Sequence, residues 1–417
     1  MNQYDVVIIG AGPSGSIAAA LLNKKGHRVC VLEKQVFPRF VIGESLLPHC
    51  MEFIEEAGML EAVVAAADEG FQFKNGAAFT WGDRYTTIDF TDKFTSGPGT
   101  TFQVMRDRFD QILIEEAQKQ GVEVRFQHQV NGIEFTDEAA ILTVSDEQQQ
   151  NAQLQAKFVL DASGYGRVLP RLLDLEQPSL LPERKVYFTH IDDHVTDPQF
   201  DRNKILISTH PQFRDVWLWF IPFSNGRTSI GVVGLAQILD NHGAEGGEAI
   251  LKKFASEIPM LKRILTNANW DNDVPFRTLS NYSADVKSLY GERFALLGNA
   301  SEFLDPVFSS GVTIAMHSSK LAADLLHRQF SGETVDWQKD YADALKIGIN
   351  AFKTYVNGWY SNAFQNVIYA ENINQDIRRY ISSILAGYAW DTNNPYVIQS
   401  ERRLAVLAEV CGEAQAC

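Results

Sequence analysis

The stretch VVIIGAGPSG, residues 6–15, decides the fold. Its first four residues are apolar and branched, which is typical of a buried parallel strand, and a glycine-rich turn follows them directly. An Ala- and Leu-rich segment then runs to Gly26, and a second apolar run spans residues 28–32. This order of strand, glycine loop, helix and strand is the βαβ unit of a doubly wound sheet, so the sequence predicts an α/β fold of the Rossmann type.

The glycine loop predicts a site for the pyrophosphate of a dinucleotide. Glycines permit a tight turn and a close backbone approach, while the N-terminus of the following helix stabilises negative charge. Glu33 ends the second strand 18 residues after Gly15, where its carboxylate can accept hydrogen bonds from an adenosine ribose. An ordinary glycine turn is the alternative, and the flanking strands favour the dinucleotide. The residues assigned to this contact are Gly10, Gly12, Pro13, Ser14, Gly15 and Glu33.

Composition limits the classes of protein that the chain can belong to. The 417 residues are 45% hydrophobic and 21% charged, as in an ordinary globular chain of two or three subdomains. A formal net charge of −15 argues against nucleic acid as a partner. Neither a membrane span nor a secretory signal is evident, so we expect a cytoplasmic protein. The cysteines have no metal-site spacing, and free thiols without a metal site are expected for Cys30, Cys50, Cys411 and Cys417.

From about residue 185 to residue 277 the pattern changes to that of antiparallel strands. The segment 217–223, an Asn-Gly turn and the segment 228–233 together predict a hairpin. Both faces of the first of these strands are apolar, so both are expected to be buried. The other expected elements are a helix over residues 107–120, strands over 122–127 and 293–297, a helix over 312–330 and a mostly helical tail from Asp336 onward.

Three later segments resemble those of the hydroxylase-type FAD-dependent oxidoreductase superfamily. They are VMR at residues 104–106, FVLDASG at 158–164, and FALLGNA at 294–300 with an Asp-Pro pair after it. The resemblance implies that FAD is the cofactor. The superfamily usually has aspartate where this chain has Asn299, whose side-chain carbonyl can still accept a hydrogen bond from a ribityl hydroxyl. The flavin contacts that the resemblance adds are Arg39, Gly43, Arg106, Asp161, Gly298, Asn299, Pro306, Gly311 and Val312.

Within that superfamily the chain resembles the flavin-dependent halogenases that act on phenols and pyrroles. WLWFIP at residues 217–222 matches the WxWxIP motif of the family, and FKNGAAFTWG at 73–82 resembles the segment with its active-site lysine, here Lys74. DPVFSSGV at 305–312 resembles the flavin-facing loop, and RFVIGESLLP at 39–48 resembles a segment that lines the flavin. The ordinary interpretations are a hydrophobic core strand, a solvent-facing lysine and a helix cap. The combination favours a halogenase.

The resemblance implies that reduced FAD and oxygen oxidise chloride or bromide to hypohalous acid, which reaches Lys74 beside an electron-rich aromatic substrate. Lys74 is the expected catalytic residue, either as an ammonium that donates to the oxidant or as an amine that carries the halogen, because burial lowers a lysine pKa. Backbone amides of Ser310 and Gly311 at a helix N-terminus would hold the halide. The residues expected to shield the flavin are Trp217, Trp219, Ile221 and Pro222.

The expected partners are a small aromatic substrate, free or bound to a carrier protein, and a separate flavin reductase, because the single dinucleotide fingerprint is assigned to FAD. The acidic charge argues against a carrier unless a basic patch such as Arg378-Arg379 or Arg402-Arg403 docks one. Two alternatives use the same scaffold, a monooxygenase and a dehydrogenase or prenyl-reductase-like enzyme. A third is a non-catalytic flavin sensor.

The expected architecture has three parts. The FAD-binding domain comprises residues 1–70, 100–184 and 278–335, the antiparallel substrate domain residues 71–99 and 185–277, and a helical covering region residues 336–417. The covering region carries aromatic residues at helical spacing, which either close the substrate pocket or pack in the core. These aromatic residues are Phe352, Tyr355, Trp359, Tyr360 and Phe364.

Overall fold

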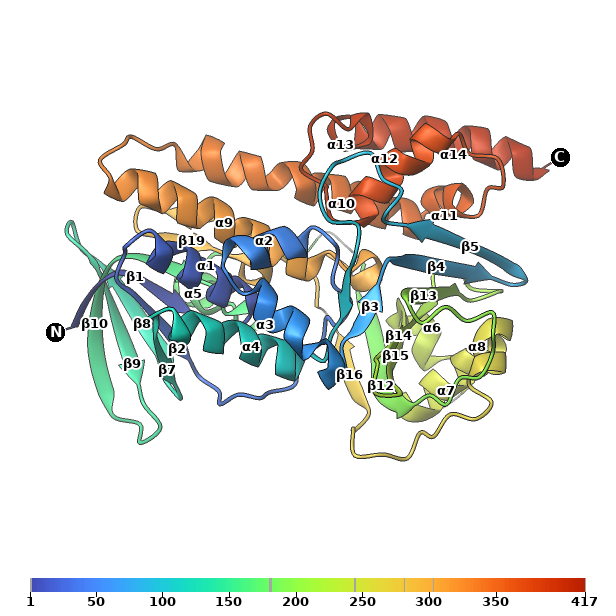
Figure 1. The fold of residues 1–417 in the computed structure, drawn as a ribbon, viewed down its shortest axis with the longest axis horizontal. Helices are drawn as coiled ribbons and strands as arrows, with labels where there is room; N and C mark the ends of the chain where they lie inside the picture. The colour runs from blue at the N-terminus through green and yellow to red at the C-terminus, as the bar shows by residue number, and fades with distance from the viewer. Residues whose placement is uncertain (1, 180–181, 244, 281, 303, 417) are drawn as a thin grey trace.

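Two β-sheet lobes lie side by side, and a row of helices runs along one edge of both (Figure 1). The structure is a computed structural model that describes residues 2–179, 182–243, 245–280, 282–302 and 304–416. Among the described residues no helix has the length and apolar character needed to cross a membrane. Cys30, Cys50 and Cys411 are free thiols, whereas Cys417 lies outside the described residues.

The first lobe contains an eight-stranded sheet whose main path runs β18-β19-β10-β1-β2-β7, with β8 and β9 attached beside β10. The strands β19, β10, β1, β2 and β7 are parallel, so their carboxyl ends meet at one edge. The strands of this sheet are β1 (Asn2–Ile9), β2 (Val29–Glu33), β7 (Glu123–Phe126), β8 (Gln129–Phe135), β9 (Ala140–Ser145), β10 (Asn151–Asp161), β18 (Tyr290–Gly291) and β19 (Phe294–Leu296).

Helices cover this sheet as the βαβ pattern predicts, and α1 packs against both α4 and α9. The predicted elements are present, and their bounds agree within one or two residues except for the first strand, which begins four residues earlier than expected, at Asn2. The doubly wound α/β fold is confirmed. The helices and short elements of this lobe are α1 (Pro13–Lys24), α2 (Cys50–Glu56), α3 (Leu60–Ala65), η1 (Ala66–Glu69), α4 (Arg106–Lys119), η2 (Gly164–Gly166), α5 (Val168–Leu172), η3 (Gly298–Ala300), η4 (Pro306–Phe308), α9 (Gly311–Phe330), and the strand pairs β3 (Gln72–Lys74) with β6 (Thr101–Gln103) and β11 (Glu176–Pro178) with β17 (Ala284–Val286).

The second lobe contains a seven-stranded sheet in the order β16-β12-β15-β14-β13-β4-β5. Its strands were expected to be antiparallel throughout, and this is wrong at one pair: β13 runs parallel to β4, because β4 enters from the other lobe. Its elements are β4 (Gly76–Trp81), β5 (Arg84–Asp89), β12 (Arg184–Asp192), β13 (Lys204–Thr209), β14 (Trp217–Pro222), β15 (Arg227–Leu235), α6 (Ala236–Asp240), α7 (Gly247–Glu257), α8 (Pro259–Ile264) and β16 (Arg277–Ser280).

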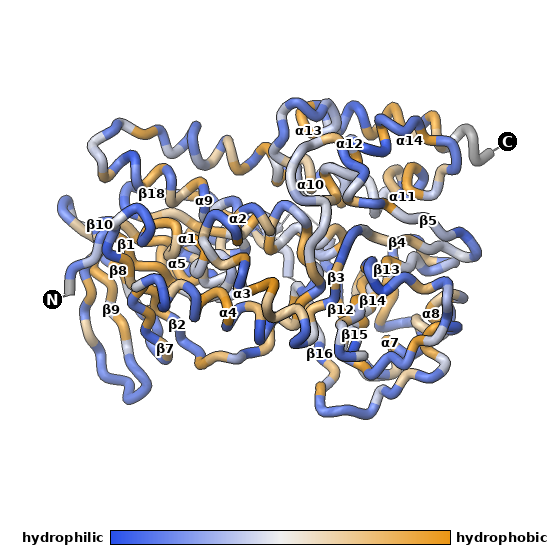
Figure 2. Tube along the Cα trace, in the orientation of Figure 1, coloured by the Kyte–Doolittle hydropathy of each residue, from blue (hydrophilic) through white to orange (hydrophobic). Residues whose placement is uncertain are grey.

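The predicted hairpin is β14 and β15, and every residue of β14 is buried. Its odd-numbered side chains join the core shared with the first lobe, while Leu218 and Phe220 join a separate core under α7 and α8. Both faces are therefore buried, as predicted. Hydrophobic stretches follow the strands of both sheets, and polar residues gather in the connecting loops (Figure 2).

The tail is helical as expected and lies over both lobes (Figure 1). It comprises the helices η5 (Gln338–Asp343), α10 (Ala344–Tyr360), α11 (Ala363–Ile368), α12 (Gln375–Leu385), α13 (Pro395–Ile398) and α14 (Ser400–Ala416). The ring of Trp359 contacts Phe79 from the second sheet and Phe308 from the end of η4. Through Trp359 the tail therefore packs against both lobes.

Candidate active site

A cavity of about 630 Å³ opens at the carboxyl ends of β1 and β2 and extends to β14. This is the edge of a doubly wound sheet at which ligands bind. The predicted site residues that line it are Gly10, Gly12, Pro13, Ser14, Glu33, Arg39, Gly43, Arg106, Trp217, Trp219, Ile221, Asn299, Pro306, Gly311 and Val312. Those that do not line it are Gly15, Lys74, Asp161, Pro222, Gly298 and Ser310.

The glycines of the loop have two different roles: Gly10 and Gly15 allow close packing, and Gly12 leaves space for a ligand. A Cβ atom at Gly15 would lie 1.9 Å from the Gly10 carbonyl oxygen, and one at Gly10, where φ is +103°, would lie 2.5 Å from the Ala162 carbonyl oxygen. Gly12 differs, because its nearest neighbour would be an Arg39 nitrogen at 3.5 Å. The free space at Gly12 faces the cavity at the N-terminus of α1, so the loop fits a pyrophosphate.

Two acidic residues at the strand ends have different surroundings. Glu33 lines the cavity, and its carboxylate accepts the Ala11 and Gln35 backbone N–H groups, which hold it at the end of β2. Its contact with an adenosine ribose stays a prediction. Asp161 is fully buried and accepts the N–H groups of Ser163 and Leu169. Burial raises the pKa of Asp161. Asp161 therefore shapes the loop after β10 from behind the cavity wall.

Arg106 holds the segment that lines the middle of the cavity. Its guanidinium forms a two-point ion pair with the buried Asp110 at 2.8 and 3.1 Å and donates to the carbonyl oxygens of Ile42 and Gly43. Arg39 reaches the same Asp110 carboxylate at 3.3 Å. Asp110 was not predicted as a site residue, although its spacing of four from Arg106 on one helix is the signal for such a pair.

Lys74 is completely buried, which excludes the interpretation as a solvent-facing charge. Its ammonium nitrogen donates to the Ser45 hydroxyl and to the Leu46 carbonyl oxygen, both at 2.7 Å, and lies 5.4 Å from the centre of the Phe90 ring. Burial lowers the pKa of Lys74 from 10.5 to about 7. Ser45 lines the cavity, so Lys74 lies one residue behind the cavity wall.

The tryptophan strand β14 forms another part of the cavity wall. Trp217, Trp219 and Ile221 face the cavity, while Pro222 points to the other face and accepts a hydrogen bond from Gln103 on its carbonyl. Trp219 donates to the Ser229 hydroxyl at 3.1 Å. This hydrogen bond and the pairing of β14 with β13 and β15 hold the wall in place.

The flavin-facing loop leads into α9. Ser309 lines the cavity with a left-handed backbone (φ 56°), and Gly311, the first residue of the 20-residue helix α9, also lines it. Ser310 is the N-cap residue, is 2% exposed, and does not line the cavity. A helix N-terminus at this position favours an anion, so the halide assignment of Ser310 and Gly311 stays a prediction.

Sequence reasoning missed a second residue of the site besides Asp110. Glu44, to which no chemistry was assigned, is 1% exposed and lines the cavity next to Ser45. One carboxylate oxygen pairs with His190, and the other has no partner among the described residues. Although burial lowers the pKa of His190, the Glu44 carboxylate outweighs this effect and leaves the pKa raised. Because the two residues are 146 positions apart, only the tertiary structure reveals the pair.

The aromatic residues of the tail pack in the core, and none of the five lines the cavity. The Tyr360 hydroxyl nevertheless contacts a cavity residue, because it accepts the indole N–H of Trp217.

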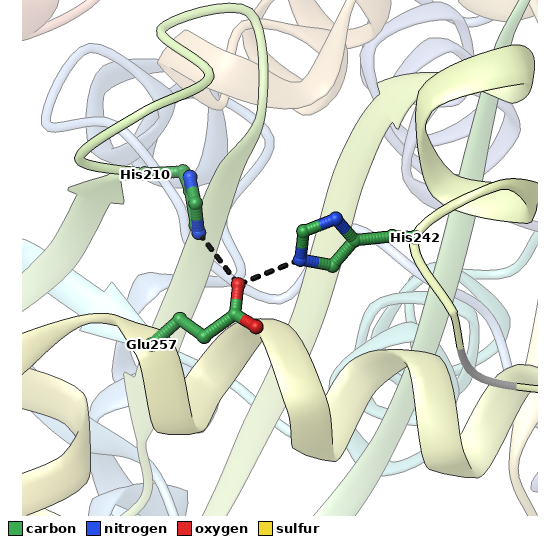
Figure 3. A group of neighbouring side chains, drawn as sticks. All are labelled: His210, His242 and Glu257. Atoms are coloured by element: carbon green, nitrogen blue, oxygen red, sulfur yellow. Dashed lines mark hydrogen bonds and ion pairs between the residues drawn. The ribbon is translucent and has the colours of Figure 1, made fainter.

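A second cluster of titratable side chains lies on the second lobe, where His210 and His242 both point at one carboxylate oxygen of Glu257 (Figure 3). The distances are 3.0 and 2.7 Å. The Nδ1 atom of His210 accepts the backbone N–H groups of Gln212 and Phe213, so its Nε2 atom carries the proton that goes to Glu257. A metal ligand must offer a lone pair at that atom. The arrangement is therefore a hydrogen-bonded clamp between α7 and the loop after β13.

Residues 3–340 match the FAD-binding domain family. A relative from Pseudomonas fluorescens, 1H-pyrrole-2-carbonyl-[peptidyl-carrier protein] chlorinase, is 31% identical over 77% of this chain and 75% of its own length. A solved flavoprotein/dehydrogenase from Cytophaga hutchinsonii is 40% identical, with a TM-score of 0.93 over 99% of this chain and all of that one. The solved flavin-dependent brominase Bmp2 is 26% identical, with a TM-score of 0.81 over the full length of both chains.

The fold, the cavity and these similarities define an FAD-dependent oxidoreductase, which is an enzyme class whose members bind the cofactor at this sheet edge. Within that class the chain belongs to the flavin-dependent halogenase family.

Proposed function

We propose that the enzyme uses reduced FAD, oxygen and chloride or bromide to halogenate an electron-rich aromatic ring of the phenol or pyrrole type. When bound, the flavin supplies the oxygen activation that oxidises the halide to hypohalous acid. The observation that carries the proposal is the burial of Lys74 directly behind the cavity wall at Ser45. Burial of a lysine amino group costs desolvation free energy that an apolar side chain at this site would not, which favours a chemical role for Lys74.

The hydrogen bonds of Lys74 suit either form of its side chain. Two N–H groups are used by Ser45 and Leu46, so an ammonium has a third N–H group for the oxygen of hypohalous acid, and an amine has a lone pair for the halogen. A pKa of about 7 makes both forms available near neutral pH. The substrate ring would then receive the halogen beside Lys74, away from the flavin.

The remaining assignments follow from this arrangement. We assign Trp217, Trp219 and Ile221 to the shield between flavin and substrate, with Pro222 ending the strand, and Ser310 and Gly311 to the halide. The cavity-lining residues bind FAD, whereas Gly15, Asp161 and Gly298 shape the loops behind it. We retain the division into an FAD-binding domain, a substrate domain and a covering region, because β4 and β5 pair into the second sheet.

The substrate is delivered in one of two ways, free or on a carrier protein. The Pseudomonas fluorescens relative acts on a carrier-bound pyrrole, which favours the carrier for this chain. A separate flavin reductase is proposed to supply reduced FAD. Rapid anaerobic reduction of the bound flavin by NADPH alone would contradict the proposal of a separate flavin reductase.

The test is product analysis by mass spectrometry. The holoenzyme, a flavin reductase and NADH are incubated with phenol, pyrrole-2-carboxylate and its carrier-bound thioester, each with chloride or bromide. We expect the replacement of one ring hydrogen by a halogen, seen as the corresponding mass shift and the halogen isotope pattern, in at least one substrate. Oxygenated products without halogen would identify a monooxygenase instead.

A second candidate is a dehydrogenase or reductase, which the 40% identity to the Cytophaga hutchinsonii flavoprotein/dehydrogenase favours. Such an enzyme has no need of a buried lysine behind a tryptophan wall. It would reduce or oxidise a substrate without oxygen, so activity under strict anaerobiosis distinguishes the two.

A further inference from the structure

Tyr360, the last residue of α10, connects two walls of the cavity without lining it. Its hydroxyl accepts the indole N–H of Trp217 at 2.9 Å and donates to the carboxylate of Asp305, also at 2.9 Å. Trp217 belongs to the tryptophan strand, and Asp305 precedes Pro306 at the start of the flavin-facing loop. The Tyr360 hydroxyl thus links the tryptophan strand to the start of the flavin-facing loop.

The carboxylate of Asp305 accepts hydrogen bonds from three donors. Asp305 is 3% exposed, its Oδ1 atom accepts the Val307 backbone N–H at 3.0 Å, and its Oδ2 atom accepts the hydroxyls of Tyr360 and Tyr282. An ionised carboxylate can accept all three bonds, whereas a protonated one must turn one oxygen into a donor. Burial raises the pKa of Asp305 to about 6, although the hydrogen bonds and Arg184 oppose it.

Arg184 on β12 holds the phenol from the other side. Its guanidinium lies 3.3 Å from the centre of the Tyr360 ring and is paired with Asp215 at 2.6 and 2.8 Å. Among the residues that the structure describes, the charged and titratable groups that act on Asp305 are Arg184, Tyr282 and Tyr360. A small cavity of about 150 Å³, bordered by Asp305, Arg184 and Tyr360 and sharing no residue with the large cavity, leaves room for water to exchange the proton.

We propose that Tyr360 is a positioning residue that sets the tryptophan wall against the flavin-facing loop, and that this link depends on the ionised state of Asp305. The inference rests on the FAD site and holds whether or not the bound flavin halogenates. Protonation of Asp305 at Oδ2 turns the oxygen that accepts the Tyr360 and Tyr282 hydroxyls into a donor. The link from Tyr360 is then lost, so the loop fits the flavin less well at acidic pH.

The test compares Tyr360→Phe with Tyr355→Phe. Tyr355 lies on the same helix, is fully buried, and donates its hydroxyl to the Tyr396 carbonyl within the tail, so the control loses the same atom and one hydrogen bond. The readout is the dissociation constant of FAD, followed by flavin fluorescence between about pH 5 and pH 8, with tryptophan fluorescence alongside.

We expect the wild type to bind FAD more weakly as the pH falls through about 6. Tyr360→Phe should weaken FAD binding about tenfold at neutral pH, since a hydrogen bond to a buried charge is lost. It should also shift the pH midpoint upward, because that bond lowers the pKa of Asp305. Tyr355→Phe should match the wild type in both respects.

Equal weakening by the two variants, or an unchanged midpoint in Tyr360→Phe, would overturn the proposal. Asp305→Asn provides a second measurement if Tyr360→Phe folds poorly, since it should bind FAD independently of pH over the same range. A pH midpoint that persists in Asp305→Asn would assign the titration to another group and overturn the role of Asp305. Because FAD binding is the readout, failure to halogenate any substrate leaves the result interpretable.

Discussion

The cofactor end and the lysine end of the active site are built in opposite ways. At the cofactor end, backbone atoms of one βαβ unit and its neighbouring strands surround an open cavity of about 630 Å³. At the lysine end, Lys74 is completely buried and is held by Ser45 and Leu46, about 30 residues away in the chain. The first end must admit a large charged ligand, whereas the second must exclude water from a small oxidant. Binding and chemistry should therefore be separable by mutation.

The largest effect is expected from breaking the cofactor end with Gly12→Val. The backbone of Gly12 has ordinary dihedral angles, and the nearest protein atom to an added Cβ is at 3.5 Å, so the apoprotein has room for the side chain. The added methyl groups occupy the space proposed for the pyrophosphate, and FAD affinity should fall about a hundredfold or more. Flavin absorbance and equilibrium dialysis measure it.

Gly412→Val is the matched control, since a Cβ there meets nothing within 4 Å and the residue does not line the cavity. A Gly12→Val protein that kept a full complement of flavin would show that the pyrophosphate lies elsewhere.

Breaking the lysine end with Lys74→Met should leave the cofactor end intact. FAD binding and oxygen consumption should remain near wild type, because those steps occur at the cavity, while halogenated product should fall by at least about a hundredfold with the loss of the positioned nitrogen. The measurements are oxygen uptake and product mass spectrometry on the same sample.

Lys204→Met is the control for the loss of a buried lysine. Lys204 is 9% exposed and lies on β13 opposite Gly76 of β4, where it pairs with Asp201 and Asn75. The Lys204→Met variant should be less stable than the wild type, but each folded molecule should halogenate at the wild-type rate. Near-native halogenation by Lys74→Met would remove the proposed role of the lysine.

The same contrast explains how far the sequence could predict the structure. The cofactor end was predictable because the residues 6–15 carry their function locally, as glycines at fixed spacing before a helix. The segment WLWFIP predicted a strand buried on both faces because its apolar residues alone indicate this, and every residue of β14 is buried. Lys74 was identified by resemblance alone, since nothing in the local pattern indicates that it is fully buried.

The remaining contacts could not be predicted, because they join distant parts of the chain. The pairs Glu44–His190 and Trp217–Tyr360 span 146 and 143 residues, and neither partner has a local signal that names the other. The parallel pairing of β13 with β4 has the same origin, since the direction of β4 depends on where the chain crosses between lobes.

A pH titration of stability sharpens the comparison further. Burial lowers the pKa of Lys74 from 10.5 in the unfolded chain to about 7 in the fold. The unfolded state therefore binds more protons between these values, and stability rises with pH across this window. Relative to Lys74→Met, the wild type should gain on the order of 2 kcal/mol between about pH 7 and pH 9 in urea unfolding. Parallel pH profiles for the two proteins would show that Lys74 is charged in the folded state.

The smallest effect is expected from Glu257→Gln, which tests a region outside both ends. Glu257 is one-third exposed and accepts hydrogen bonds from His210 and His242. The glutamine variant keeps one acceptor oxygen, so the protein should lose about 1 kcal/mol of stability at most. FAD binding and halogenation should remain at wild-type values. Because the Nε2 atom of His210 is a donor, added zinc should not raise the melting temperature of the wild type above that of Glu257→Gln. If zinc raised the melting temperature of the wild type alone, the Nε2 atom of His210 would have to lose its proton to bind the metal, and the clamp would be a metal site.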